Sequence, residues 1–320
     1  MTTMLVTGSH GWVGTHICRL LAGQGHRVVG VGRRPQTMAG RYLQFDLHDA
    51  AAVDVALDEV RPDVVFHLAG ATPQREPEVG RLVADCVGGT YSIGHALRTV
   101  ARRYRYRPRL VLAGSSAQYG AVPWEQNPVS EQALPRPTGA YGHAKLAAEA
   151  TAFALAADGH IEVVAARAFN HVGPGETVGT VAGALARRIA DVAAGRSSRV
   201  RVGDLDAVRD FTDVRDIARA YLAMAQKGKS GDAYNVCSES GVAIRTVLDI
   251  LLALANLDHS VVDLGADRGG IGHQVGSAGR LRGETGWTPR IPLRQSLRDL
   301  LAEHWSGPLR SGGETTKGAT

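Results

Sequence analysis

The amino-acid sequence predicts an α/β fold in which a doubly wound parallel sheet is joined to a smaller α/β lobe. Short apolar runs alternate with helical patterns along the first half of the chain. These runs are continuously apolar rather than alternating with polar residues, which is typical of parallel strands covered by helices on both faces. The length of 320 residues is enough for about two domains of ~150 residues each.

Five apolar runs are the predicted strands of the sheet. They cover residues 4–7, 28–32, 64–68, 110–113 and 161–166, with helical patterns between them, the first at 12–22. After Asn170 the rhythm changes to glycine-bearing loops at 171–183, a helix at 184–194, a short strand near Val200 and an amphipathic helix at 291–305. We expect the segment 212–229 and the strand 233–236 to return to the sheet.

This change of rhythm suggests how the chain divides. We expect a larger Rossmann-type domain from residues 1–170 and about 212–240, and a smaller lobe from about 171–211 and 241–306. Residues 307–320 consist mostly of Gly, Ser, Thr and a few charged residues. Because such a segment has little apolar surface to bury, we expect a disordered tail.

Composition excludes several classes of protein. The three cysteines, Cys18, Cys86 and Cys237, have no CxxC spacing, so we expect reduced thiols and neither a disulfide framework nor a metal site. No run approaches the ~20 apolar residues of a membrane span, and no basic leader precedes the first strand, so a cytoplasmic protein is expected. The net charge is +5, but the dense arginine run at 102–109 is interpreted as a solvated helix end rather than a nucleic-acid surface.

A glycine-rich turn joins the first predicted strand to the first predicted helix. Its GxxGxxG spacing lets the backbone approach a pyrophosphate, whose charge then meets the free N–H groups at the start of the helix. In this position the motif predicts a dinucleotide-binding site rather than an ordinary glycine turn. The expected contacts are Gly8, His10, Gly11, Trp12, Val13 and Gly14.

The second predicted strand indicates which dinucleotide binds. An NAD site usually has Asp or Glu at this point, but here the strand runs into Gly32, Arg33 and Arg34. Guanidinium groups suit a 2′-phosphate, so NADP is favoured over NAD, the alternative being two solvated surface arginines. By topology, further cofactor contacts are expected at Asp46, Leu47, Leu68, Ala69, Gly70 and Ala168.

A tyrosine and a lysine with helical spacing form the candidate catalytic pair. Tyr141 and Lys145 are four residues apart and so lie on one helix face. A nearby ammonium stabilises a phenolate, so the tyrosine can give or take a proton near neutral pH. Ser115, at the carboxyl end of a buried strand, would face the same crevice and orient a substrate oxygen. The alternatives are an exposed helix pair and a local serine turn.

Together these motifs resemble the extended short-chain dehydrogenases/reductases that act on nucleotide sugars, over roughly residues 3–306. The resemblance is carried by GxxGxxG, SSAQYG at 115–120, YGHAK at 141–145, RAFNHVGPG at 167–175 and VRDFTDVRD at 208–216. Within that superfamily, FNHVGPG, RDFTDVRD and AYNVCS at 233–238 are most similar to GDP-4-dehydro-6-deoxy-D-mannose reductases and GDP-mannose 4,6-dehydratases.

The resemblance implies roles for individual residues. Ser115, Tyr141 and Lys145 would form the catalytic triad, and Lys145 would also hold the nicotinamide ribose. The substrate would be bound by Ser116, Asn170, Arg187, Arg188, Arg209 and Arg268, with Asn170 and Arg209 at its diphosphate. Long helices at 78–104 and 141–157 would form a four-helix homodimer interface.

Two features depart from the family pattern. Cys86 stands where relatives often have Asn, and Arg268 is followed by Gly-Gly-Ile-Gly rather than by Pro and then an acid. His10, His143 and His171 have no partner at metal spacing and are interpreted as packing or substrate-edge residues.

The expected activity is NADPH-dependent reduction of a nucleotide-linked 4-keto-6-deoxyhexose. A C4-epimerase, a 4,6-dehydratase and a non-enzymatic NADP sensor remain as alternatives.

Overall fold

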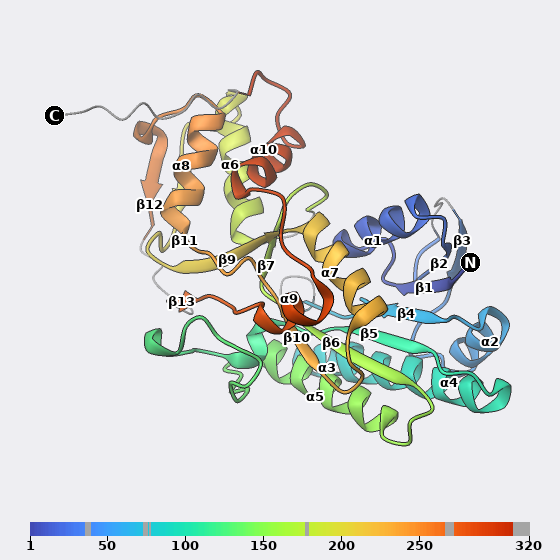
Figure 1. Cartoon of the computed structure of the whole chain (residues 1–320). Coiled ribbons are helices and arrows are strands. Elements are labelled where there is room, and N and C mark those ends of the chain that lie inside the picture. Colours follow the sequence, from blue (N-terminus) through green and yellow to red (C-terminus); the bar gives the residue numbers. More distant parts are fainter. Residues whose placement is uncertain (36–39, 73–75, 77, 177–178, 266–271, 310–320) are drawn as a thin grey trace.

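A seven-stranded parallel sheet forms the centre of the protein (Figure 1). The computed structural model describes residues 1–35, 40–72, 76, 78–176, 179–265 and 272–309. The sheet has the order β10-β6-β5-β4-β1-β2-β3, so the direction of winding reverses between β1 and β4. Its strands are β1 (Thr3–Thr7), β2 (Arg27–Gly32), β3 (Arg41–Gln44), β4 (Val64–His67), β5 (Arg109–Ala113), β6 (Glu162–Ala168) and β10 (Ala233–Val236). The predicted doubly wound parallel sheet is confirmed.

Two helical layers cover the sheet, as Figure 1 shows. One layer contains α1 (Trp12–Gly23), α7 (Val214–Lys227) and α9 (Gly279–Thr285), and the other contains α2 (Ala50–Val60), α3 (Val79–Val83), α4 (Gly89–Tyr104) and α5 (Ala140–Ala156). Alternate residues of β1 serve the two layers: Met4 and Val6 belong to the core with α1 and α7, and Leu5 to the core with α2 and α4. Burial on both faces explains why the strands are continuously apolar.

A second group of elements has its own core. It comprises β7 (Asn170–Val172), α6 (Val181–Ala193), β8 (Val200–Val202), β9 (Val208–Asp213), β11 (Gly241–Ala243), α8 (Ile244–Leu254), β12 (Val262–Leu264), β13 (His273–Gln274) and α10 (Leu293–Ala302). Strands β7, β9, β11 and β13 form one small sheet, and β8 pairs with β12. Leu185, Leu248 and Leu297 bring α6, α8 and α10 together in this core.

Several predicted elements have different bounds in the structure. The helix predicted at 184–194 is α6 (Val181–Ala193), and the helix predicted at 291–305 is α10 (Leu293–Ala302). Strand β6 continues two residues past the predicted end, because Arg167 and Ala168 keep their pairing with β10. The predicted helix at 78–104 is one helical run with a π-helical turn, η1 (Ala84–Gly88), between α3 and α4. Of the helices within the described ranges, not one has the length and apolar character needed to cross a membrane.

Candidate active site

A cavity of about 840 Å³ lies at the carboxyl edge of the main sheet. Its walls come from the segments that follow β1, β2, β3, β4 and β5, together with the β6–β7 segment. The edge beside the β1–β4 reversal is where doubly wound sheets bind ligands. Fifteen residues from the sequence predictions line the cavity: Gly8, Gly11, Trp12, Val13, Gly14, Arg33, Asp46, Leu47, Leu68, Ala69, Gly70, Ser115, Tyr141, Ala168 and Asn170.

The glycine turn has the backbone geometry that its sequence requires. Gly8 has a φ of +66°, and a Cβ on Gly14 would lie 2.2 Å from the Gly8 carbonyl oxygen, so a side chain at Gly14 would clash. Helix α1 follows with Gly11 as its N-cap, and the described structure shows no side chain capping it. The first N–H groups of α1 therefore remain available to an anion in the cavity.

Tyr42, which was not predicted as a site residue, contacts the segment that follows β2. Its hydroxyl donates a hydrogen bond to the Arg34 carbonyl at 2.5 Å, and its ring packs edge-on against the exposed His10 at 4.8 Å. Arg33 lines the cavity, whereas His10 and Arg34 are not among the described lining residues. Cofactor contacts by His10 and Arg34 stay predictions.

Lys145 is held one helical turn beyond Tyr141 on α5. Its Nζ donates a hydrogen bond to the Ala113 carbonyl at 2.8 Å and lies 5.8 Å from the centroid of the Tyr141 ring. The side chain is buried while Tyr141 borders the cavity. This arrangement brings a positive charge next to the phenol that faces the ligand space.

A buried histidine lies behind the lysine. His67, at the end of β4, has Nδ1 2.8 Å from the Thr7 hydroxyl oxygen. Burial, and then the charge of Lys145, lower the pKa of His67 to about 3. The imidazole is therefore neutral and does not oppose the lysine at physiological pH. His67 was not predicted as a site residue, although it directly precedes the predicted cofactor residues Leu68, Ala69 and Gly70.

Ser115 is fixed by a capping box at the short 3-10 helix η2 (Ser116–Tyr119). Its hydroxyl accepts a hydrogen bond from the Ala117 N–H at 3.2 Å, and its own N–H donates to Gln118 Oε1 at 2.9 Å. Gln118 in turn donates to Glu149 Oε2 at 2.9 Å. Gln118 therefore links Ser115, the candidate catalytic serine, to Glu149 on α5.

An ion pair between Glu149 and Arg167 anchors this network. The two side chains are 5% and 9% exposed, and Arg167 Nη2 lies 2.6 Å from Glu149 Oε1. Arg167 also donates to the Tyr119 hydroxyl at 3.1 Å, and that hydroxyl donates to Asn235 Oδ1 at 2.7 Å. Because these buried polar groups are hydrogen-bonded to one another, the network can hold η2, α5, β6 and β10 in one arrangement.

The predicted substrate residues fall into two groups. Asn170 lines the cavity and donates a hydrogen bond to the Asp210 carbonyl at 3.4 Å. Ser116, Arg187, Arg188 and Arg209 are not among the described lining residues, and Arg268 lies outside the described residues.

Three residues of the second group make hydrogen bonds within the protein. Ser116 is buried and donates to Gln274 Oε1 at 3.4 Å. Arg188 donates to the Arg201 carbonyl at 2.6 Å, and Arg209 donates to the Val208 carbonyl at 2.9 Å. Their roles in substrate binding stay predictions.

Two further histidines have different surroundings. His171 lines the cavity beside Trp12, with ring centroids 5.9 Å apart, and burial lowers its pKa to about 4. His143 is exposed on α5, with Nδ1 3.0 Å from the Gly139 carbonyl oxygen. Among the described residues, His, Cys, Asp and Glu side chains form no cluster able to hold a metal ion.

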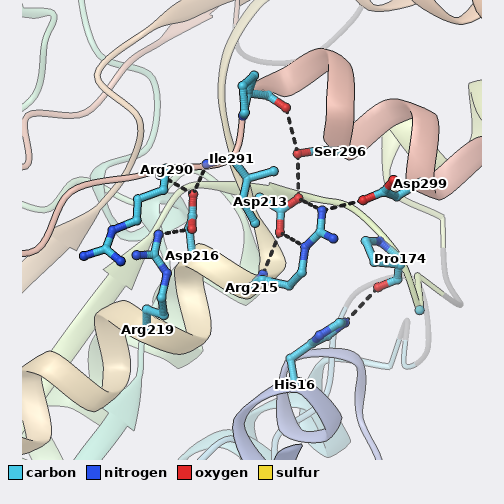
Figure 2. A network of polar contacts seen from close by, with 12 residues as sticks. His16, Pro174, Asp213, Arg215, Asp216, Arg219, Arg290, Ile291, Ser296 and Asp299 are labelled. Carbon is cyan, nitrogen blue, oxygen red and sulfur yellow. Dashed lines mark hydrogen bonds and ion pairs between the residues drawn. The ribbon is translucent and has the colours of Figure 1, made fainter. Parts of the chain in front are cut away.

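Two acidic residues of VRDFTDVRD, Asp213 and Asp216, join separate elements of the fold (Figure 2). Asp213 caps α7 and accepts a hydrogen bond from the Ser296 hydroxyl of α10 at 2.6 Å. Asp216 accepts from the N–H groups of Arg290 and Ile291 at 2.7 and 2.9 Å. These contacts join α7, next to the sheet, to the chain that leads into α10.

Known proteins are similar to this chain in sequence. The model of the NAD-dependent epimerase/dehydratase family matches residues 4–237. The chain is 32% identical to GDP-6-deoxy-D-mannose reductase from Pseudomonas aeruginosa, over 96% of this chain and 98% of that protein. It is 30% identical to UDP-glucose 4-epimerase from Streptomyces lividans, over 95% of this chain and 96% of that protein.

A solved structure agrees with this similarity. The structure of RMD from Pseudomonas aeruginosa complexed with NADPH has a TM-score of 0.85 at 31% identity, and the match covers 96% of this chain and 99% of that one. The resemblance to extended short-chain dehydrogenases/reductases predicted from the sequence is confirmed. The chain therefore belongs to the NAD-dependent epimerase/dehydratase family.

Proposed function

We propose that the protein is an NADPH-dependent reductase of a nucleotide-linked 4-keto-6-deoxyhexose. The observation that carries the proposal is a single cavity whose wall includes the glycine turn, Arg33, Ser115 and Tyr141, with Lys145 next to Tyr141. The similarity to a GDP-6-deoxy-D-mannose reductase over nearly the whole of both chains supports this activity.

The cavity residues fit a dinucleotide. Uncapped N–H groups at the start of α1 suit a pyrophosphate, and the missing side chain at Gly14 leaves room for the close turn. Arg33 would take the 2′-phosphate that distinguishes NADPH from NADH. Asp46 and Leu47 would flank the adenine, and Leu68, Ala69, Gly70 and Ala168 would border the rest of the cofactor. When bound, the reduced nicotinamide supplies a hydride.

Three side chains would act on the sugar. Ser115, fixed by its capping box, would donate a hydrogen bond to the C4 carbonyl oxygen and orient it. Tyr141 would then give that oxygen its phenolic proton as the negative charge develops. Lys145 would stabilise the resulting phenolate through its charge and, when NADPH is bound, would hold the nicotinamide ribose.

The smaller lobe would hold the nucleotide end of the substrate. Asn170 is in place at the cavity wall. Arg209 would pair with the diphosphate, with Ser116 nearer the sugar and Arg187, Arg188 or Arg268 adding further contacts.

An epimerase is the second candidate, and a specific observation favours it. The similarity to the Streptomyces lividans UDP-glucose 4-epimerase spans almost the entire chain, and interconversion at C4 can use the same three side chains.

A dehydratase is less well supported because elimination at C5 and C6 needs an additional acid or base. The two residues after Ser115 are Ser116 and Ala117, so neither supplies a carboxylate. A sensor that binds NADP without catalysis would not need Ser115, Tyr141 and Lys145 at the cavity.

An assay with defined nucleotide sugars tests the activity. With a nucleotide-linked 4-keto-6-deoxyhexose we expect NADPH oxidation in proportion to the ketone reduced. With GDP-mannose and other plain nucleotide hexoses we expect no alkali-sensitive 4-keto chromophore. Robust formation of that chromophore would replace the reductase by a dehydratase, and interconversion of two C4 epimers without net NADPH consumption would replace it by an epimerase.

We also propose a homodimer through a four-helix interface. Val79 and Val83 on α3 and Tyr91 on α4 are 54%, 41% and 51% exposed in the isolated chain. A second copy packed against α4 and α5 would cover apolar surface of this kind. Light scattering at micromolar concentration should give twice the chain mass, and a monomer would contradict the proposal.

A further inference from the structure

One wall of the cavity comes from two segments far apart in the sequence. The chain after β3 contributes Phe45, Asp46, Leu47 and His48, and the helical run through α3 and η1 contributes Arg81, Ala84 and Asp85. The two segments are in contact, because a Cβ on Gly88 would lie 3.5 Å from the His48 ring and one on Gly89 3.4 Å from Leu47 Cδ1. The segment with Asp46 and Leu47 is the part of the wall assigned above to adenine.

Arg81 faces this part of the cavity because of its helical spacing. Arg81, Ala84 and Asp85 stand at positions i, i+3 and i+4, which share one helix face. All three line the cavity, although η1 is a π-helical turn. Glu78 fixes the start of the run, because its carboxylate accepts the N–H groups of Gly80 and Arg81 at 2.7 and 2.8 Å.

Within the part of the chain that the structure describes, the guanidinium of Arg81 forms no close ion pair, although its charge, after hydrogen bonds from two backbone N–H groups, contributes to lowering the pKa of Glu78. Asp85 would be its natural i+4 partner, but Asp85 Oδ1 lies 3.0 Å from His48 Nε2. Among the described residues, no carboxylate forms an ion pair with Arg81. The side chain is exposed at the cavity wall, next to the apolar Ala84. A planar cation in such a place suits a flat, electron-rich ring.

We infer that Arg81 is a cofactor-positioning residue that lays its guanidinium against the adenine ring, opposite the segment of Asp46 and Leu47. This inference rests on the proposed function, since it requires a dinucleotide in the cavity. It assigns different tasks to two arginines. Arg33 distinguishes NADPH from NADH through the 2′-phosphate, whereas Arg81 contacts a ring that both cofactors share and so binds them without distinction.

Titration of the purified protein with NADPH and with NADH, in the absence of sugar substrate, tests the inference. Arg81→Ala should raise the Kd of both cofactors by about three- to thirty-fold, which corresponds to about 0.7–2 kcal/mol. Arg33→Ala should raise the Kd of NADPH by about ten- to a hundred-fold and change that of NADH little. Arg81→Lys, which keeps the charge but loses the planar group, should remain weakened for both cofactors.

A matched control comes from the same helical run. Arg102 is exposed in the last turn of α4, away from the cavity, so Arg102→Ala should leave both Kd values unchanged. Unchanged Kd values for a folded Arg81→Ala protein, with folding checked by circular dichroism, would overturn the inference. A loss confined to NADPH would overturn it too, because Arg81 would then contact the phosphate. Failure of the parent protein to bind either cofactor would instead contradict the proposed function.

Discussion

Lys145 is positioned by neighbours that carry no charge of their own. Its ammonium donates to the Ala113 carbonyl, and the nearby His67 is kept neutral by burial, which lowers its pKa to about 3. A carboxylate in either place would attract the ammonium and weaken its effect on the phenol of Tyr141. The local chemistry therefore leaves the lysine charge available to Tyr141.

Replacing the tyrosine separates proton transfer from cofactor binding. Tyr141→Phe keeps the ring but removes the proton donor, so kcat should fall by about 10²–10⁴-fold while the Kd of NADPH stays within a factor of a few. Lys145→Met should impair both, because the lysine is expected to serve the tyrosine and the nicotinamide ribose. Steady-state kinetics and cofactor titration measure the two effects. Near-normal turnover by the Phe variant would mean that another group supplies the proton.

The sequence motifs predicted individual site residues, but they did not predict which distant residues hydrogen-bond to them. The motifs place Ser115 and Tyr141 at the cavity, as expected from the strand end and helix start that carry them. The partners that hold Ser115 are separated along the chain: Gln118 bonds Glu149 31 residues later, and Tyr119 bonds Asn235 116 residues later. One sequence without an alignment contains no signal for such pairs, since only the fold brings them together.

At the scale of the elements, polar contacts tie the first turn of α7 to the chain around α10 (Figure 2). Asp213 caps the helix through the Arg215 N–H at 2.8 Å and binds the Ser296 hydroxyl of α10. Its side chain is fully buried, and Arg215 also reaches Asp299 at 2.7 Å. One carboxylate thus joins two helices that lie in different cores.

Removing that carboxylate should destabilise the protein markedly. Asp213→Ala deletes a helix cap and leaves part of a partly buried guanidinium without a partner. It also reduces the hydrogen bonding of the Ser296 hydroxyl to the longer contact with the Pro292 carbonyl at 3.3 Å. The free energy of unfolding should therefore fall by about 2–4 kcal/mol. Asp299→Ala is the matched control, because it removes the partly exposed partner of the same arginine and should cost about 1 kcal/mol or less. Urea unfolding followed by circular dichroism measures both changes. Equal effects of the two substitutions would contradict the role given to Asp213.

Element boundaries were predictable where apolar periodicity continues and not where a polar network replaces it. The prediction ends β6 at residue 166 because Arg167 interrupts the apolar run, yet the strand continues because Glu149 neutralises that arginine in the interior. The π-helical turn at Ala84–Gly88 was not predicted either, since the sequence there reads as part of one continuous helix.

For the molecule as a whole, buried ionisable groups determine how stability depends on pH. Burial lowers the pKa of His67 to about 3 and that of His171 to about 4, so both remain neutral in the native state. Burial has the opposite consequence for Asp210, whose pKa rises to about 6 despite hydrogen bonds from Ser238, Glu239 and Gly276. These three groups lie in different parts of the fold and act on one unfolding equilibrium.

The histidines and Asp210 change the stability in opposite directions as the pH falls. The unfolded histidines titrate near 6.5, so the stability gained by keeping His67 and His171 neutral is complete above that pH and is lost as the pH falls toward their native values. The unfolded Asp210 titrates near 4, so the native state gains stability from its protonation as the pH falls from about 6 to 4. Two groups therefore destabilise the acidified protein and one partly compensates.

The resulting prediction is a net loss of stability in mild acid. Between pH 6.5 and 5, the free energy of unfolding should fall by about 2 kcal/mol, each histidine costing about 1.5 kcal/mol and Asp210 returning about 1 kcal/mol. His67→Asn can keep a hydrogen bond to Thr7 and cannot titrate, so this variant should lose less than about 1 kcal/mol over the same interval. Urea unfolding curves at both pH values, for both proteins, measure the difference. If the variant were as acid-sensitive as the parent, His67 would not be a source of the pH dependence, and the neutral imidazole placed beside Lys145 would have to be reconsidered as well.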